Sequence, residues 1–222
     1  MLWDGAGRLA LSDLPIHQPE RPTTSSKDVG CDAFQNQENP EVAGYGIHCF
    51  GCCVCGVFSK KFMRRLMHLT GNKQVIAFLE MWTVLRLVEL FGENLRGYLV
   101  HFAEDNTNTV SWCNNGHSNS SAAAAGLCKT LALQCLFFDI IMLAVDTRSK
   151  LNCIPDAASR VLADADDGKA AMAELVTLMD EWCTTRSPST EVIISTDAVV
   201  SDMLIEPESR FPFIADSPST LQ

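Results

Sequence analysis

The sequence predicts an α/β protein with one mixed sheet of five strands and helices on its faces. Three strand-like runs follow one another at 29–34, 42–50 and 52–59, which is typical of an antiparallel meander. Two further runs, 97–103 and 140–145, are separated from their neighbours by helix-like segments, which is typical of parallel additions to the same sheet. The last run is continuously apolar, so we expect that strand to be covered on both faces.

The helix-like segments show apolar residues at helical spacing, together with residues that start or stop helices. The segment 59–71 begins at the capping residue Ser59 and ends at Gly71. The segment 74–92 is apolar on most sides, so we expect it to be packed heavily. Further helices are expected at 106–115, 121–138, 156–165 and 168–183.

The chain divides into a central domain and extensions. Residues 1–27 are rich in Pro, Ser and Thr and indicate a linker or connector. The α/β domain is expected at 28–165, followed by a C-terminal helix at 166–183. Residues 184–222 again hold many Ser, Thr and Pro, which predicts a mostly loose tail with one strand candidate at 191–195.

Composition and charge exclude several classes of protein. The 222 residues suffice for a buried core, and the net charge of −10 argues against a broad attraction to nucleic acid. Any such binding needs a local basic patch or metal ions. No apolar run is long enough to cross a bilayer, and the N-terminus does not resemble a signal peptide. We therefore expect an intracellular protein of the cytoplasm or nucleus, not a secreted one, with no membrane partner.

Four of the ten cysteines form a group at Cys49, Cys52, Cys53 and Cys55. Structural zinc sites usually take two ligand pairs separated by a loop, and no suitably spaced second pair follows here. The preferred interpretation is an apolar strand that carries buried thiols in a reducing compartment.

Four acidic residues occupy positions that the predicted elements bring together. Asp32 lies within the first strand, Asp105 directly follows the fourth strand, and Glu80 and Asp156 lie on helices. If the first and fourth strands are neighbours, Asp32 and Asp105 lie side by side. Four carboxylates in one place repel one another strongly, so the cluster makes sense mainly as a cage for hard divalent cations. We expect two Mg²⁺ ions, with Mn²⁺ as a substitute, about 4 Å apart and placed to clamp the attacking and leaving oxygens of a phosphodiester.

Each carboxylate also has a simpler interpretation. An Asp at a strand end, such as Asp105, is often a turn or helix cap, and Asp156 after a proline is suited to be an N-cap. Asp32 has the alternative of an ion pair with Lys27 or an arginine. Glu80 has the alternative of a solvated helix position, although both of its neighbours are apolar.

Other polar residues are candidates for metal-binding, catalytic or substrate-contact roles. Glu104 is expected to point to the side of its strand away from Asp105, so it is not counted as a ligand. His117 is the histidine kept as a catalytic candidate. Four basic residues of one predicted helix suit the backbone phosphates of a nucleic acid, or simply form a solvated face. They are Lys60, Lys61, Arg64 and Arg65.

Several of these stretches carry a resemblance in chain order. "CDAF", "GYGI", "IAFLEMWTVLRL", "AEDNTNTVSWCNNGHS" and "NCIPDAASR", over about residues 29 to 162, resemble the ribonuclease H domain of reverse-transcribing retroelements, DIRS-like retrotransposons in particular. The resemblance implies a ribonuclease H-like fold and places Asn106 and Asn115 near the substrate. It also implies four catalytic, metal-binding carboxylates, which are Asp32, Glu80, Asp105 and Asp156.

The function implied by the resemblance is that of a metal-dependent endonuclease that hydrolyses the RNA strand of RNA–DNA hybrids during retroelement reverse transcription. Its partners would be the hybrid and an upstream reverse transcriptase polymerase domain. A second hypothesis is a degenerate or co-opted, non-catalytic interaction module. This is favoured by the net charge and by the loop before Asp156, which lacks the His and Gly that these elements carry there. A third hypothesis is another nuclease or an integrase of the same fold.

Overall fold

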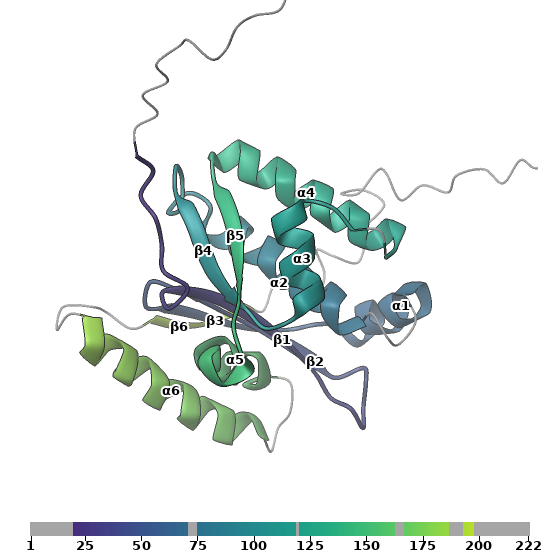
Figure 1. Cartoon of the computed structure of the whole chain (residues 1–222). Coiled ribbons are helices and arrows are strands. Elements are labelled where there is room, and N and C mark those ends of the chain that lie inside the picture. The colour runs from purple at the N-terminus through teal and green to yellow at the C-terminus, as the bar shows by residue number, and fades with distance from the viewer. Residues whose placement is uncertain (1–19, 71–74, 119, 163–166, 187–192, 198–222) are drawn as a thin grey trace, which may run out of the picture.

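A six-stranded sheet organises the molecule (Figure 1), in the order β5-β4-β1-β2-β3-β6. The computed structural model describes residues 20–70, 75–118, 120–162, 167–186 and 193–197. The strands are β1 (Val29–Gln35), β2 (Ala43–Cys49), β3 (Cys52–Val57), β4 (Leu99–Glu104), β5 (Ile141–Asp146) and β6 (Ile193–Asp197). The first three form an antiparallel meander, while β4 runs parallel to β1 and β5 parallel to β4. The predicted α/β class, with a ribonuclease H-like mixed sheet of β1 to β5, is confirmed.

Helices cover both faces of the sheet (Figure 1). They are α1 (Lys60–Thr70), α2 (Val75–Phe91), α3 (Thr107–Asn115), α4 (Ala122–Phe138), α5 (Cys153–Arg160) and α6 (Asp167–Arg186). The larger core lies between the sheet and the layer formed by α2 and α4, and a smaller one lies between β3, α5 and α6. No helix in the described ranges has the length and apolar character needed to cross a membrane.

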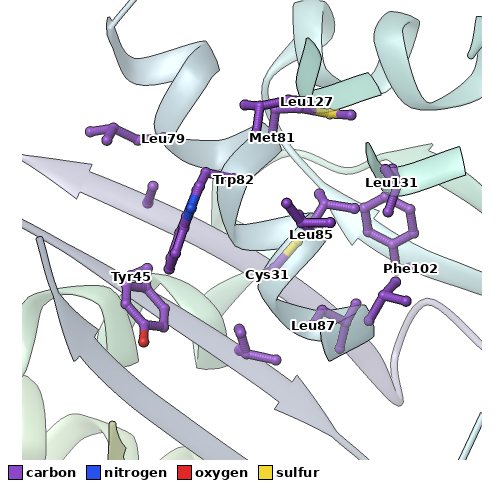
Figure 2. Close-up of a cluster of buried hydrophobic side chains, with 14 of the residues drawn as sticks. Cys31, Tyr45, Leu79, Met81, Trp82, Leu85, Leu87, Phe102, Leu127 and Leu131 are labelled. Atoms are coloured by element: carbon purple, nitrogen blue, oxygen red, sulfur yellow. The ribbon is translucent and has the colours of Figure 1, made fainter. Parts of the chain in front are cut away.

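The helix α2 forms the centre of the larger core, as its apolar sequence predicts. Most of its side chains are buried, including Leu79, Trp82 and Leu87. Figure 2 shows Trp82 lying against Tyr45 of β2, with ring centroids 5.3 Å apart and the rings edge to face. Burying large aromatic side chains in this geometry stabilises the contact between helix and sheet, and so it fixes where every residue of α2 lies.

The strand candidate predicted at 191–195 is present in the described part of the tail, and the C-terminal helix extends beyond the predicted 166–183. The helix α6 continues to Arg186, and Ile193–Asp197 form β6, which pairs in parallel with β3 from Cys52 to Gly56. Without β6 the edge of β3 would present unpaired backbone groups, which is the physical reason for a sixth strand. Three stretches predicted as tail or linker, 1–19, 187–192 and 198–222, lie outside the described residues.

The strand β5 was predicted to be covered on both faces, and this is wrong. Its side chains alternate, with Met142 and Ala144 buried and Ile141, Leu143 and Val145 exposed. The reason is position, because β5 is an outer strand and the second helical layer, α5 and α6, lies over β1, β2 and β3 instead (Figure 1).

Candidate metal centre

The register between two parallel strands brings Asp32 and Asp105 to the same level. The strands β1 and β4 pair at one position, Gly30 opposite Ala103. Each aspartate lies two residues beyond this pair in its own chain segment. Because parallel strands advance at the same rate per residue, the two carboxylates meet where β4 ends, beside the middle of β1.

The third carboxylate, Glu80, comes from the second turn of α2. It is 4 % exposed, so the alternative of a solvated helix residue is excluded. The hydroxyl group of Thr109 on α3 lies 3.3 Å from Oε2 of Glu80 and 3.2 Å from the carbonyl oxygen of Ala77. The packing of α2 and α3 over the sheet therefore places the Glu80 carboxylate next to Asp32 of β1 and Asp105 after β4.

Asp32, Glu80 and Asp105 form what we call the carboxylate trio. One oxygen of each lies within 4.8 Å of the other two, with Asp32 and Glu80 buried and Asp105 partly exposed. Within the described ranges, this is the one group of three or more His, Cys, Asp or Glu side chains that gather closely enough to hold a metal ion.

Burial and the charges of neighbouring carboxylates raise the pKa values of the two buried members of the trio, Asp32 and Glu80. Burial is the largest cause for Asp32, whose pKa rises to about 7 although a hydrogen bond from Ser159 opposes the shift. Burial is also the first cause for Glu80, followed by the charge of Glu104, and together they raise its pKa to about 11. Carboxylates that are this costly to ionise need protons or a cation at neutral pH.

A hard divalent cation fits this group. All the donors of the trio are carboxylate oxygens, which Mg²⁺ and Mn²⁺ prefer over nitrogen or sulfur. A cation would replace the protons that burial otherwise forces onto these groups. The trio is thus a candidate site for a divalent cation, and its geometry by itself does not select one metal.

The trio opens into a cavity of about 680 Å³, which we call the acidic cavity. Besides the trio, its wall includes Ala33 to Glu38 of β1 and the following loop, and Ile76 of α2. Two residues of α5, Asp156 and Arg160, complete it. The space is large enough for part of a substrate beside a bound ion.

The fourth predicted ligand, Asp156, shares the acidic cavity but does not belong to the trio. Its Oδ1 accepts a hydrogen bond of 2.5 Å from Nη2 of Arg160, one helical turn later. Burial raises its pKa, and the positive charge of Arg160 opposes this. The structure therefore brings three of the four predicted carboxylates together and leaves the fourth in an ion pair at the cavity wall.

The alternative of an N-cap at Asp156 is wrong. The helix α5 begins at Cys153, three residues earlier than predicted, and Asn152 occupies the N-cap position. Pro155 does not prevent this, because the backbone nitrogens of the first helical turn have no partner within the helix. Asp156 lies inside α5, from which its side chain reaches the cavity.

Two residues that the sequence analysis did not single out place α5 beside Asp32. Nδ2 of Asn152 donates a hydrogen bond of 2.9 Å to the carbonyl oxygen of Cys31. Gly46 lies opposite Asp32 in the β1–β2 register, and a Cβ atom there would come within 2.2 Å of the carbonyl oxygen of Pro155. The glycine thus allows α5 to lie directly on β2. The available signal was a glycine inside a strand, which often marks close backbone approach.

Glu104 is a further buried carboxylate next to the trio. Its Oε2 accepts from the thiol of Cys31 at 3.6 Å, and its Oε1 accepts from the backbone N–H of Asn106 at 3.1 Å. Cys31 and Asp32 point to opposite faces of β1, so Glu104 lies on the face away from Asp32. Burial raises its pKa to about 8. Glu104 lies two residues after the buried Phe102 on the same strand, so both side chains point to the same face, and this spacing was the signal for burial. The charge of Glu104 also raises the pKa of Glu80.

The predicted substrate residues Asn106 and Asn115 have local structural roles in the fold. Oδ1 of Asn106 accepts from two backbone N–H groups and caps α3, and Nδ2 of Asn115 donates to the hydroxyl group of Ser111. His117 is exposed, and its Nδ1 lies 3.0 Å from the carbonyl oxygen of Asn115. None of the three is among the described residues that line the acidic cavity.

The basic residues predicted to contact substrate lie on the exposed side of α1, outside the described lining of the acidic cavity. Arg64 makes two hydrogen bonds to Glu41, at 2.7 and 2.9 Å. The set is Lys60, Lys61, Arg64 and Arg65. They form a basic helix surface, and whether it meets a nucleic acid stays a prediction.

The cysteine group lies in the hairpin of β2 and β3. Cys49, Cys53 and Cys55 are buried, and Cys49 faces Cys52 across the hairpin. Among the residues described, no cysteine belongs to a group close enough to hold a metal ion.

Comparisons with known proteins leave this site without an assignment. No protein-family model matches the chain, and no curated protein matches it. The functional argument therefore depends on the residues of the acidic cavity and on the fold that places them.

Proposed function

We propose that this protein is a metal-dependent nuclease of the ribonuclease H type, which hydrolyses the RNA strand of RNA–DNA hybrids in retroelement reverse transcription. The observation that carries the proposal is the carboxylate trio, which lies at the carboxyl end of β4 and beside the middle of β1, in a sheet of ribonuclease H-like order. Asp156 in the same cavity supplies a fourth carboxylate. An upstream polymerase domain would deliver the hybrid.

In this proposal the trio holds one divalent cation, and Asp156 with Asp32 and Asp105 contributes to a second position. Bound Mg²⁺ supplies activation of the attacking water and stabilisation of the leaving 3′ oxygen. The protein itself orients the carboxylates through the register of β1 and β4, the packing of α2 and the close seat of α5. Selectivity for RNA would come from contacts to the 2′-hydroxyl groups across the shallow minor groove.

The test is cleavage of a labelled RNA–DNA hybrid with Mg²⁺ by the wild type and by Asp105→Asn. Asp105 is partly exposed, so the isosteric change leaves the fold intact while removing a ligand. We expect activity to fall at least about 100-fold. Asp180→Asn, an exposed aspartate of α6, is the matched control and should cleave like the wild type. Undiminished cleavage by Asp105→Asn refutes the proposal. Parallel reactions with double-stranded DNA and single strands distinguish a different nuclease or an integrase.

The second candidate is a non-catalytic module, which is favoured by the ion pair that occupies Asp156 and by the net charge of −10. The two candidates differ in their response to metal. A protein with a working carboxylate site binds Mg²⁺ only in its folded state, so the melting temperature of the protein rises with Mg²⁺ concentration. An unchanged melting temperature at millimolar Mg²⁺ supports the non-catalytic module.

A further inference from the structure

Arg160 lines the acidic cavity together with its ion-pair partner, the fourth carboxylate Asp156. Its Nη2 donates to Oδ1 of Asp156 at 2.5 Å, one turn away on α5. Its positive charge also opposes the rise in the pKa of Asp32, so it acts on the trio as well. Among the described residues that line the cavity, Arg160 is the one base, against five acids.

The position of Arg160 is fixed by more than one contact. Its guanidinium group lies over the ring of Phe34, 5.8 Å from the ring centroid. Phe34 follows Asp32 by two residues on β1, so the two side chains share one face of the strand. A cation over an aromatic face is stabilised by the ring electrons, which holds Arg160 at the wall next to Asp156.

We propose that Arg160 acts as a built-in competitor for the second metal position. Resting on the proposed function above, this means that the trio takes the first divalent cation, while the second binds only as Arg160 releases Asp156. The guanidinium group supplies one positive charge where a metal ion would supply two. Each weakens the other's contact with Asp156, because the two cations repel each other and compete for the same carboxylate. Arg160 is then a positioning residue that sets the metal concentration at which the site is completed.

The experiment measures the binding of Mn²⁺ alone to the full chain by calorimetry, with the ion count checked by electron paramagnetic resonance. For the wild type we expect one tightly bound ion and a second, weaker one. Arg160→Gln should strengthen binding of the second ion by about tenfold, within the range of usual couplings between sites. Arg160→Lys keeps the positive charge but loses the planar guanidinium group that donates to Asp156. Its affinity for the second ion should lie between those of the wild type and Arg160→Gln.

Two controls separate this competition from a general loss of positive charge. The double variant Arg160→Gln/Asp156→Asn should not bind the second ion more tightly than the wild type, because the carboxylate freed by the first change is removed by the second. Arg148→Gln removes an exposed arginine that lines a separate cavity near α6, and it should bind both ions like the wild type. In the wild type, the Nε–Hε nuclear magnetic resonance signal of Arg160 should move with the second equivalent of metal and not with the first.

The outcomes also separate this proposal from the nuclease proposal. An identical second affinity in the wild type and Arg160→Gln, or a gain that persists in the double variant, overturns the role of Arg160 and leaves the trio as a metal site. Two equally tight ions in the wild type overturn it in the same way. If neither the wild type nor any variant binds Mn²⁺, both proposals fail together.

Discussion

The carboxylate trio and Asp156 reach the same cavity by different means. The trio depends on the register of adjacent strands and on α2, whose side chains are mostly buried in the larger core. Asp156 depends on the short helix α5, which packs over the smaller core and whose close approach to the sheet is allowed by Gly46 and supported by the hydrogen bond of Asn152. The trio is therefore built into the sheet, while the fourth carboxylate is attached to it.

The two parts also differ in how their charges are compensated. Asp32 and Glu80 are almost inaccessible to water, with 5 % and 4 % of their surface exposed, and their pKa values rise to about 7 and about 11. The side chain of Asp156 is 29 % exposed and has Arg160 as a partner. Among the described residues, Asp156 has Arg160 as its direct counterion, whereas the carboxylates of the trio lie mainly against one another. Each prediction below acts on one part and leaves the other as a reference.

The largest effect is expected from Gly46→Val, which breaks the attachment of α5. A Cβ atom at this position meets the backbone of Pro155 and Ser159 at under 3 Å, so the helix has to move away from β2. We expect a loss of about 3 kcal/mol in the free energy of unfolding, measured by urea denaturation. Gly126→Ala is the matched control, since a Cβ atom there meets nothing within 4 Å, and it should be neutral or slightly stabilising. A Gly46→Val variant as stable as the wild type contradicts the close seat of α5.

The trio should make the metal-free protein less stable as the pH rises. The pKa of Asp32 is higher in the folded chain than the unfolded value of 3.8, so folding retains a proton. The free energy of unfolding then falls as the pH rises from about 4 to about 7, by at most about 1.4 kcal/mol per pH unit for this residue. Asp32→Asn should lack this part of the decline when chelator-treated samples are unfolded in urea at pH 4 and pH 8. Equal slopes for variant and wild type would show that Asp32 is not forced to hold a proton.

Asn152→Ala weakens the attachment of α5 without introducing bulk. It leaves the buried carbonyl oxygen of Cys31 without this hydrogen bond, which is expected to cost about 1.5 kcal/mol. The exposed Asn115→Ala is the control and should change stability by less than about 0.5 kcal/mol. Thermal and urea unfolding measure both variants. If they behave alike, Asn152 does not anchor α5.

The smallest effect on stability is expected from Asp156→Asn. The ion pair with Arg160 is partly exposed, so its loss should cost about 0.5 kcal/mol in urea denaturation without metal. The comparison becomes sharper beside Glu80→Gln, which replaces a buried carboxyl group that is already protonated at pH 8 and should leave the metal-free protein about as stable as the wild type. A large loss for Asp156→Asn would mean that α5 depends on this pair for its position.

Much of the fold was readable from local patterns. The alternation and length of the apolar runs predicted β1 to β4 and their neighbours, and the order of strands and helices predicted a mixed sheet. The approach of Asp32 and Asp105 followed from placing the first and fourth strands side by side. Prediction was less successful where the neighbours of a segment are distant in the chain, as for the open face of β5 and for β6 beside β3.

The sequence by itself determined which strand residues point into the core and which acids lie within or directly after strands. These properties depend on the period of the local backbone. The tertiary structure alone decided that Asp156 is held by Arg160 in the cavity, that Asn152 ties α5 to β1, and that Glu104 is buried beside Cys31. Such contacts depend on how closely packed elements approach one another, and no spacing along the chain specifies that distance.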